Sequence, residues 1–414
     1  MRIFNICNME KDSIIVRQQY VDAVLQRIDM GQIIVLTGQR RVGKSCVMRM
    51  VRDAVLKKNS KATIIFIDKE YTEFRSIKKD EDLENYVYPL LGDADDTYLF
   101  IDEVQDIQGF ENTLRSMQAK QQCHIIVTGS NAKMLSSELS TYLSGRYTEV
   151  HIQSLSYVEF IKFHNLDDSD ASLLKYLTYG GLPFICKIGI EKVELVKNYL
   201  ENIYNTIVLK DVIEREQIRN TYFLDSLSHF ISDNIGKNVS ATSISKFMKS
   251  QNENIATYLV LNYLKFLCNA YIINKVPRFD IHGKRLLETN EKFYFEDLGL
   301  RNRLCDFNLQ QRIEKVIENA IYLHLKNCGY KITVGYLLNS EIDFVAEKDG
   351  HRAYIQACYQ LSNEDTRQRE YGNLQAIKDN YPKYVVSMDL LASNGEYKGI
   401  KSIHLRDFLK QTEF

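Results

Sequence analysis

The chain has 414 residues, of which 45% are hydrophobic and 26% are charged, and its formal net charge is -1. This balance is typical of a folded protein with a sizeable core, and it excludes a disordered or low-complexity chain. The length predicts two or three domains of about 150 residues each.

Charge is spread evenly. Residues 1–154 hold 20 Lys and Arg against 21 Asp and Glu, residues 155–310 hold 19 against 19, and the remainder holds 14 against 14. Composition therefore gives no support for a strongly basic nucleic-acid-binding domain. The eight cysteines lack CxxC spacing, which predicts reduced core thiols in a cytoplasmic protein. The longest apolar runs are strand-sized, so we expect no membrane segment.

From residue 31 to about residue 152, short β-branched runs alternate with amphipathic stretches. This alternation predicts a parallel sheet with helices on both faces. The expected strands are 33–37, 63–68, 98–102, 124–128 and 147–152. Residues 1–154 are therefore expected to form an α/β domain.

The sequence GQRRVGKS, from Gly38 to Ser45, fits the pattern GxxxxGK[ST] between a predicted strand and a predicted helix. In such a loop the glycines, Gly38 and Gly43 here, let backbone N–H groups curl around phosphates. The Lys44 ammonium bridges the phosphates, and the Ser45 hydroxyl ligates Mg²⁺. The loop, which includes Arg41, therefore predicts a site for ATP and Mg²⁺.

An apolar strand, YLFID, ends in the carboxylates Asp102 and Glu103. Ligands bind at the carboxyl ends of parallel strands, so this pair is expected to meet the phosphates. Asp102 is expected to hold the Mg²⁺ shell, and Glu103 to polarise the attacking water.

The next strand, HIIVT, is followed by Gly129, Ser130 and Asn131. A polar side chain at this position can reach the γ-phosphate or the water. The alternative is that Ser130 or Asn131 only caps a helix expected at 132–139. The residues alone do not choose between the two side chains.

The rest of the chain reads as three further regions. Residues 155–222 show helical periodicity and predict a helical lid. Residues 223–310 read as three helices and a short hairpin, which predicts a winged helix. Residues 311–414 alternate strands and helices again and predict a separate α/β domain.

The succession GQRRVGKS, LFIDEVQ, VTGSN and LSGR resembles the AAA+ ATPases. More narrowly, it is similar to a bacterial and archaeal family of predicted ATPases with a helical region and a nuclease-like tail. The resemblance covers nearly the whole chain and is strongest over the first 150 residues. It implies an AAA+ parallel sheet, a lid, a winged helix and a restriction-endonuclease-like C-terminal domain.

The resemblance also assigns roles to single residues. It favours Ser130 as the sensor and implies that Arg146 is an arginine finger, a group that often comes from a neighbouring subunit. The alternative for Arg146 is a surface ion pair. Pro183, in the sequence GGLP, resembles the adenine-side motif of signalling ATPases, although a helix stop explains it equally well. Arg17 is a weaker candidate for nucleotide contact.

The tail resembles the PD-(D/E)xK nucleases, in which two acids hold Mg²⁺ and a lysine activates water. The matching acids are Glu318, Glu341 and Asp343. However, Gln356 stands where the second acid of the motif is expected.

Cys358 stands where the lysine is expected, and a thiol supplies no ammonium. We therefore expect a nuclease-like fold without cleavage. A lysine that has moved elsewhere, such as Lys348, keeps the opposite interpretation open.

The leading hypothesis is thus an ATP-driven switch or motor that forms a homo-oligomer or acts on an unidentified protein partner. The alternative is a DNA-binding or DNA-processing protein that uses the winged helix and the tail under ATP control. Both hypotheses share the same ATP site.

Overall fold

The computed structural model describes residues 15–132, 143, 145–251, 253–337, 340–361, 364–389 and 395–414. The chain divides into two compact units. Unit 1 comprises residues 1–153 and 269–271, and unit 2 comprises residues 154–268 and 272–414. Residues 133–142, where most of the helix after Asn131 is expected, lie outside the described part.

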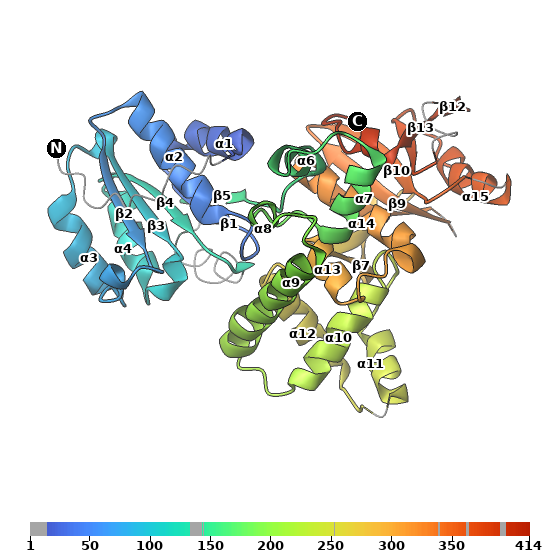
Figure 1. Cartoon of the computed structure of the whole chain (residues 1–414), viewed down its shortest axis with the longest axis horizontal. Helices are drawn as coiled ribbons and strands as arrows, with labels where there is room; N and C mark the ends of the chain where they lie inside the picture. The colour runs from blue at the N-terminus through green and yellow to red at the C-terminus, as the bar shows by residue number, and fades with distance from the viewer. Residues whose placement is uncertain are drawn as a thin grey trace. The chain divides into compact units, whose positions relative to one another are not determined.

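Unit 1 is built on a five-stranded sheet in the order β2-β3-β4-β1-β5 (Figure 1). The strands are β1 (Ile33–Thr37), β2 (Thr63–Asp68), β3 (Thr97–Asp102), β4 (His124–Thr128) and β5 (Tyr147–His151). All four pairings are parallel. The expected parallel sheet is therefore confirmed, and each strand begins and ends within one residue of its predicted limits.

Helices cover both faces of this sheet, and β1 is buried along its whole length. The helices are α1 (Gln18–Ile28), α2 (Lys44–Lys58), α3 (Asp80–Val87) and α4 (Phe110–Ala119). Ile33 and Val35 of β1 pack in one cluster with Leu83 of α3 and Leu114 of α4. Alternate residues such as Leu36 face the opposite side of the sheet, where α1 and α2 pack on β1.

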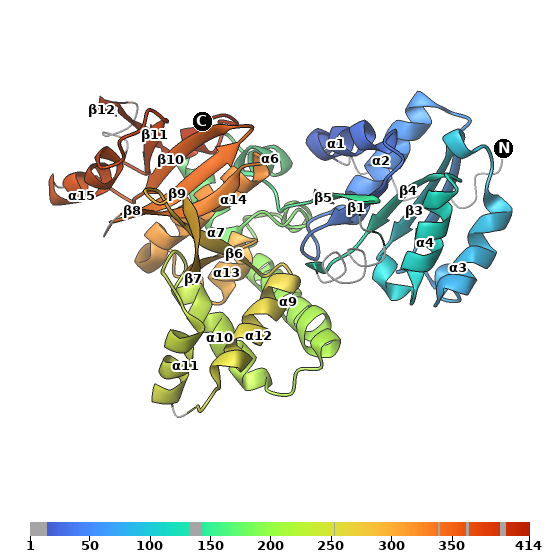
Figure 2. The same cartoon turned by 180° about the vertical axis from the view of Figure 1, so that it is seen from behind.

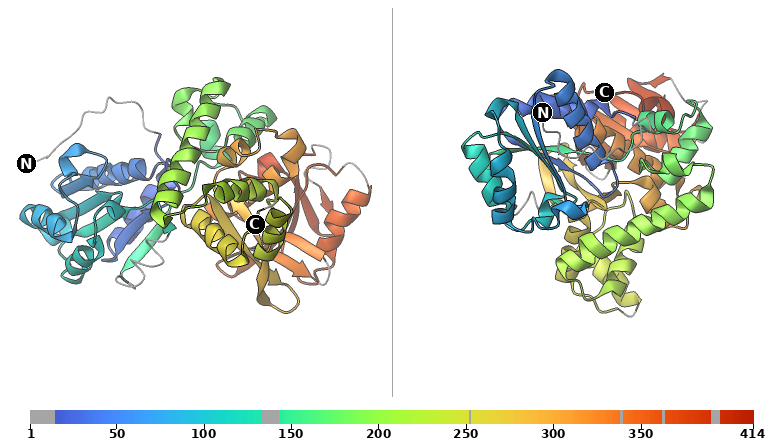
Figure 3. Two further views of the ribbon diagram at one scale, coloured as in Figure 1. Left: turned by 90° about the horizontal axis from the view of Figure 1, so that it is seen from below. Right: turned by 60° about the vertical axis from the view of Figure 1, so that its left-hand side comes forward.

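Unit 2 begins with a series of helices. They are α6 (Tyr157–Phe163), α7 (Asp170–Tyr179), α8 (Ile185–Ile188), α9 (Val193–Ile207), α10 (Thr221–Asp233), α11 (Ala241–Ser250) and α12 (Thr257–Asn269). A π-helical segment, η6 (Val208–Glu214), continues α9, and together they form one long rod in Figure 3. Within the described residues, no helix has the length and hydropathy needed to cross a membrane.

The remainder of unit 2 is an eight-stranded mixed sheet in the order β12-β13-β11-β10-β9-β8-β6-β7 (Figure 2). Its strands are β6 (Ile273–Asp280), β7 (Arg285–Phe295), β8 (Lys331–Leu337), β9 (Ser340–Lys348), β10 (His351–Ala357), β11 (Lys383–Ser387), β12 (Glu396–Tyr397) and β13 (Ile400–His404). The helices of this region are α13 (Leu298–Arg303), α14 (Ile313–Asn327), α15 (Glu364–Gln375) and α16 (Leu405–Phe408).

The hairpin β6–β7 differs from the expectation that it is the wing of a winged helix. It follows α10, α11 and α12 as predicted, but β6 pairs in parallel with β8, so the hairpin extends the sheet of the tail. The reason is packing: the Tyr294 ring on β7 lies 4.7 Å from that of Tyr322 on α14 and 5.5 Å from that of Phe344 on β9. The expected boundary between residues 310 and 311 therefore crosses one continuous sheet.

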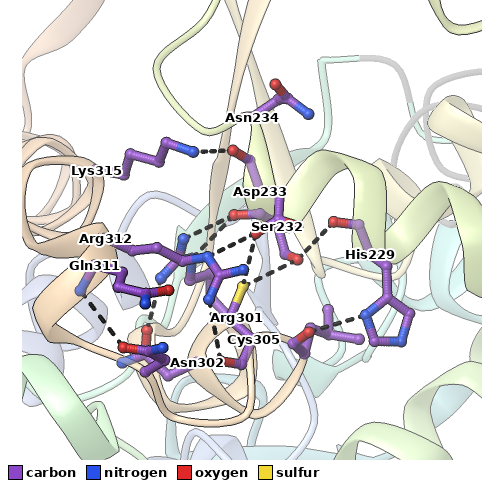
Figure 4. A network of polar contacts seen from close by, with 12 residues as sticks. His229, Ser232, Asp233, Asn234, Arg301, Asn302, Cys305, Gln311, Arg312 and Lys315 are labelled. Carbon is purple, nitrogen blue, oxygen red and sulfur yellow. Dashed lines mark hydrogen bonds and ion pairs between the residues drawn. The ribbon is translucent and has the colours of Figure 1, made fainter. Parts of the chain in front are cut away.

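Three cations, of which Arg301 is buried, surround the carboxyl end of α10 (Figure 4). Arg301 is completely buried, and its Nε and Nη2 donate to the carbonyl oxygen of Ser232 at 3.1 and 2.9 Å. Lys315 donates to the carbonyl oxygen of Asp233, and Arg312 Nε donates to the Asp233 carboxylate at 2.7 Å. The last carbonyls of a helix lack intrahelical partners and carry partial negative charge, so these cations stabilise the helix end.

We predict that Arg301→Ala lowers the free energy of unfolding of unit 2 by about 2–3 kcal/mol, because the buried carbonyl of Ser232 loses its donors. Arg303→Ala is the matched control, since Arg303 pairs at 2.9 Å with the exposed Glu201. An exposed pair contributes ~0–1 kcal/mol. Urea unfolding followed by circular dichroism measures both variants, and equal losses would contradict the capping role.

Candidate nucleotide site

The phosphate loop connects β1 to α2 at the carboxyl edge of the unit 1 sheet. Gly38 has φ +134°, and a Cβ there would lie 2.1 Å from the carbonyl oxygen of Ile152. Gly43, with φ +100°, is the N-cap of α2. Both positions require glycine, because a side chain would clash at the first and strain the backbone at the second. Arg41 is exposed and also has a left-handed φ of 68°.

Lys44 is the first residue of α2, and its side chain folds back over the loop. Its ammonium donates to the carbonyl oxygens of Gly38 at 2.9 Å and Gln39 at 3.1 Å. The side chain is buried, with an exposed fraction of 5%. A fixed positive charge therefore lies inside the loop, beside the positive end of the α2 dipole.

Asp102 lies at the end of β3 and is buried. Its carboxylate accepts hydrogen bonds from the hydroxyl groups of Thr128, at 2.5 Å, and Ser45. Burial raises the pKa of Asp102 above its usual value, the two hydroxyl groups oppose the shift, and the charges of Glu103 and Asp68 add to it. A cation bound here would offset this accumulation of negative charge.

Asp68, at the end of β2, is the register partner of Asp102 on the neighbouring strand. Its carboxylate forms an ion pair with Arg49 of α2 at 2.9 Å. Asp68 is almost completely buried, with an exposed fraction of 2%. Arg49 therefore supplies the counter-charge that a second buried acid at this edge requires.

Glu103 follows Asp102 in a left-handed conformation, with φ 54°. Its N–H donates to the Thr128 hydroxyl at 2.8 Å, and its carboxylate accepts from the Gln105 amide. Burial alone would raise the pKa of Glu103, but Lys44, the Gln105 amide, Arg40 and Ser130 together lower it below its usual value. Glu103 is therefore ionised at neutral pH.

Ser130 and Asn131 follow β4 and are both buried. The two differ in their relation to the acids, because the Ser130 hydroxyl is one of the groups that lower the pKa of Glu103. The structure thus brings Ser130 to the carboxylate that is expected to meet the attacking water.

The donors at this edge suit Mg²⁺ that arrives with a nucleotide. No three His, Cys, Asp or Glu side chains in the described part of the chain are arranged to hold a metal ion by themselves. Mg²⁺ prefers one or two carboxylates, several waters and substrate phosphates over an all-protein cage. The Ser45 hydroxyl and the Asp102 carboxylate, in contact beside the loop, fit that requirement.

Arg146 lies at the amino ends of the strands, whereas the phosphate loop lies at their carboxyl ends. It directly precedes β5, and its carbonyl oxygen accepts from the N–H of Ile33, the first residue of β1, at 2.9 Å. The loop begins only after the last residue of β1, about 13 Å further along the strand. Arg146 is exposed. Its backbone position rules out a contact with the loop of its own chain.

Pro183 belongs to unit 2, where the preceding glycines are packed tightly. The Gly181 N–H donates to the buried Asp297 carboxylate at 2.8 Å, and the Gly181 carbonyl accepts from the N–H of Leu155 at 2.7 Å. A Cβ at Gly180 would lie 2.4 Å from the backbone nitrogen of Gly299. This packing explains the two glycines, and a nucleotide contact of Pro183 stays a prediction.

Arg17 supports the loop from behind. Its guanidinium donates to the carbonyl oxygens of Val42 at 3.2 Å and Gln153 at 2.8 Å, and it lies 4.5 Å from the Tyr20 ring centroid. Its exposed fraction is 4%, so it is a buried side chain that links the loop to Gln153 at the end of unit 1.

In the tail, the structure brings Glu318, Glu341 and Asp343 together around Lys292 of β7. The lysine suggested from the sequence, Lys348, is elsewhere: its ammonium donates to the carbonyl oxygen of Cys328 at 2.9 Å. The alternative interpretation, in which Lys348 serves the acids, therefore loses its example. Lys348 lies five residues beyond Asp343 on β9, about 16 Å along the strand.

The two residues that depart from the nuclease pattern lie on or directly after β10. The Gln356 side-chain oxygen accepts from the N–H of Asp343 at 3.3 Å. Cys358 is buried, and burial raises the pKa of its thiol, so it stays protonated.

Sequence reasoning missed Thr128, Asp68 and Arg49. The signal for Asp68 was present, because TIIFID ends in an acid as YLFID does. Thr128 was visible as the last residue of HIIVT, but its role depends on the pairing of β3 with β4.

Comparisons with known proteins identify an AAA domain in the first part of the chain. Residues 30–161 match a family model described as an AAA domain, and residues 170–311 match a domain of unknown function. A solved Walker-type ATPase of Pyrococcus abyssi shares the fold, with a TM-score of 0.50 and 16% identity, over 72% of this chain and 97% of that one.

Two relatives align over most of their length. An uncharacterized protein of Haemophilus influenzae is 31% identical over 405 residues, which is 96% of this chain and 99% of the relative. One of Methanocaldococcus jannaschii is 30% identical over 366 residues, which is 84% of this chain and 79% of the relative. The chain belongs to the same family as these two proteins, and its residues 30–161, which include the phosphate loop and the acidic strand end, match the model of an AAA domain.

Proposed function

We propose that this protein is an Mg²⁺-dependent ATPase in which ATP binding and hydrolysis drive a switch or motor. The observation that carries the proposal is the edge of the unit 1 sheet. There, Lys44 lies inside the loop, the Ser45 hydroxyl contacts Asp102, and the ionised Glu103 lies within the electrostatic influence of Lys44. This is the set of parts that phosphoryl transfer needs.

Binding rests on the loop. Its backbone N–H groups and the α2 dipole attract the phosphates, and the Lys44 ammonium neutralises part of their charge. Arg41, exposed on the loop, adds a second cation near the nucleotide. When bound, Mg²⁺ supplies charge neutralisation between the phosphates, with Ser45 and Asp102 as its protein ligands.

Hydrolysis rests on Glu103. An ionised carboxylate can accept a hydrogen bond from water and draw the proton away as the water attacks. The Thr128 hydroxyl fixes the backbone of Glu103, and Ser130 acts as the sensor beside its carboxylate. Thr128 of β4 thus orients both Asp102 and Glu103 at the end of the neighbouring strand β3.

Several features support a cytoplasmic switch or motor. The seven cysteines within the described residues are all free, as in a reducing compartment. The nucleotide edge lies in unit 1, so unit 2 is available to respond to it or to bind a protein partner. We propose a homo-oligomer, because the position of Arg146 allows it to serve only the site of another subunit.

A second candidate function is nucleic-acid binding under ATP control. Residues 234–270 hold four lysines and one acid, Glu253, although charge is balanced over the chain as a whole. The lysines, all exposed on α11, α12 and the loop before α11, are Lys237, Lys246, Lys249 and Lys265. This local excess is suited to a phosphate backbone.

Replacing Glu103 tests the leading proposal. Glu103→Gln should bind ATP with unchanged affinity but hydrolyse it ~10²–10⁴-fold more slowly, because an amide cannot act as a base. Steady-state phosphate release and equilibrium binding of labelled ATP measure the two effects. Glu111→Gln on α4 is the control and should behave as wild type. Normal turnover by Glu103→Gln would reject the assignment.

The second prediction concerns Arg146. If it acts on a neighbouring subunit, Arg146→Ala should bind ATP normally and hydrolyse it slowly, because only the transition-state charge loses its partner. Arg115→Ala, an exposed arginine of α4, should have no effect. Wild-type turnover per subunit should rise with protein concentration.

A mixture of Arg146→Ala and Glu103→Gln should recover part of the activity, because some interfaces then combine an intact arginine with an intact base. Each variant alone stays slow. If the protein is a monomer and its turnover per subunit does not depend on protein concentration, Arg146 does not act on a neighbouring subunit.

Nucleic-acid binding is tested by a salt series with duplex DNA, with and without ATP. The slope of log affinity against log salt should flatten by about 0.9 for each of the four lysines changed to Ala. Lys331→Ala, an exposed lysine of β8, is the control and should keep the wild-type slope. A slope that none of the four changes alters would eliminate this second function.

A further inference from the structure

Lys292 lies between three carboxylates in the interior of unit 2. Its ammonium is 2.7 Å from Glu341 Oε1, 3.1 Å from Glu318 Oε1 and 3.5 Å from Asp343 Oδ1. Its side chain has an exposed fraction of 1%. The lysine comes from β7, whereas the acids come from α14 and β9, so the contacts join three elements.

Each carboxylate also accepts a hydrogen bond from a second protein group. The donors are the Tyr294 hydroxyl to Glu318 at 2.6 Å, the Asn238 amide to Glu341 at 2.6 Å and the Ala357 N–H to Asp343 at 2.9 Å. These bonds and the ammonium engage five of the six carboxylate oxygens that a metal ion could use.

The turn between α10 and α11 closes over the cluster. Gly236 has φ +70°, and a Cβ built there would lie 2.1 Å from Glu318 Oε2. The backbone of the turn therefore packs directly against Glu318 Oε2, the remaining carboxylate oxygen of the cluster. Water and ions have little room on this side.

Acids from a helix and a strand that converge on one point are a common arrangement for a divalent cation. Here the donors do not fit one, because an ammonium already contacts all three carboxylates. We propose that Lys292 is the resident cation of this cluster, and that its ammonium replaces a divalent ion and holds β7 to α14 and β9.

The electrostatics agree with this assignment. Burial alone would lower the pKa of Lys292, but the charges of Glu318, Asp343 and Glu341 raise it, so the ammonium stays charged. Burial and the charge of Glu318 raise the pKa of Asp343 to about 8. One lysine cannot neutralise three carboxylates. At neutral pH a proton on Asp343 therefore removes part of the remaining negative charge.

The test compares full-length variants by thermal unfolding with and without Mn²⁺. All carry Asp102→Asn, so that the nucleotide site lacks its carboxylate ligand. Lys292→Met should lower the Tm of unit 2 by on the order of 10 °C, because the acids lose their counter-charge. Mn²⁺ should restore several degrees to Lys292→Met and change nothing in the parent.

Lys275→Met is the matched control. Lys275 lies on the neighbouring strand β6 and pairs with Glu291 at 2.8 Å, but its side chain is 54% exposed. Its loss should leave the Tm within about 2 °C of the parent. Equal stability of Lys292→Met and Lys275→Met would overturn the proposal.

A rescue experiment separates charge from packing. Adding Glu318→Gln and Glu341→Gln to Lys292→Met removes two of the unpaired charges and should recover most of the lost Tm. No recovery would show that the lysine stem, rather than its charge, matters, and would overturn the proposal.

If Lys292→Met fails to fold, calorimetric titration of the parent with Mn²⁺ decides. We expect the parent to show no saturable Mn²⁺ binding at this cluster. Saturable binding that disappears in the Asp343→Asn variant would overturn the proposal. So would Mg²⁺-dependent DNA cleavage that both Asp343→Asn and Lys292→Arg abolish, since the lysine would then serve a nuclease.

Discussion

One hydroxyl group organises the nucleotide edge. Thr128 ends β4 and contacts two consecutive acids at the end of β3: it donates to the carboxylate of Asp102, the last residue of the strand, and accepts from the N–H of Glu103, the residue after it. The first bond holds Asp102, the proposed metal ligand, toward Ser45. The second holds Glu103 in a left-handed backbone conformation that turns its side chain to another direction. Two adjacent carboxylates can therefore do different chemistry only while β3 and β4 keep their register.

Much of unit 1 could be predicted because its signals are local. A buried parallel strand is apolar throughout, so β1 and β4 stand out in the sequence, and the loop after β1 carries its own pattern. The positions of Asp102 and Glu103 follow from the same logic, since acids that directly follow such a strand lie at its carboxyl edge. The pairing of Arg49 with Asp68 could not be predicted, because either residue reads alone as an ordinary surface charge.

Unit 2 was harder because its decisive contacts join residues far apart in the chain. The hairpin β6–β7 has the pattern of a wing, and only its pairing with β8 shows that it belongs to the tail. Lys292 reads as one charge in an alternating strand, yet it meets Glu318, 26 residues later, and Asp343, 51 residues later. The motif directed attention to lysines near Asp343 in sequence, so Lys348 was the example named for the alternative interpretation.

The shared sheet has a consequence for dividing the gene product into pieces. The matched domain of unknown function ends at residue 311, twenty residues before β8 begins. A fragment cut there would keep β6 but lose β8, so the backbone groups of Arg278 to Asp280 that pair with β8 would be left without partners. Lys292 would also lose all three of its acidic partners. An unpaired strand edge recruits strands from other molecules, so the fragment should precipitate or pair with itself. A workable fragment of unit 2 must extend to the end of the chain.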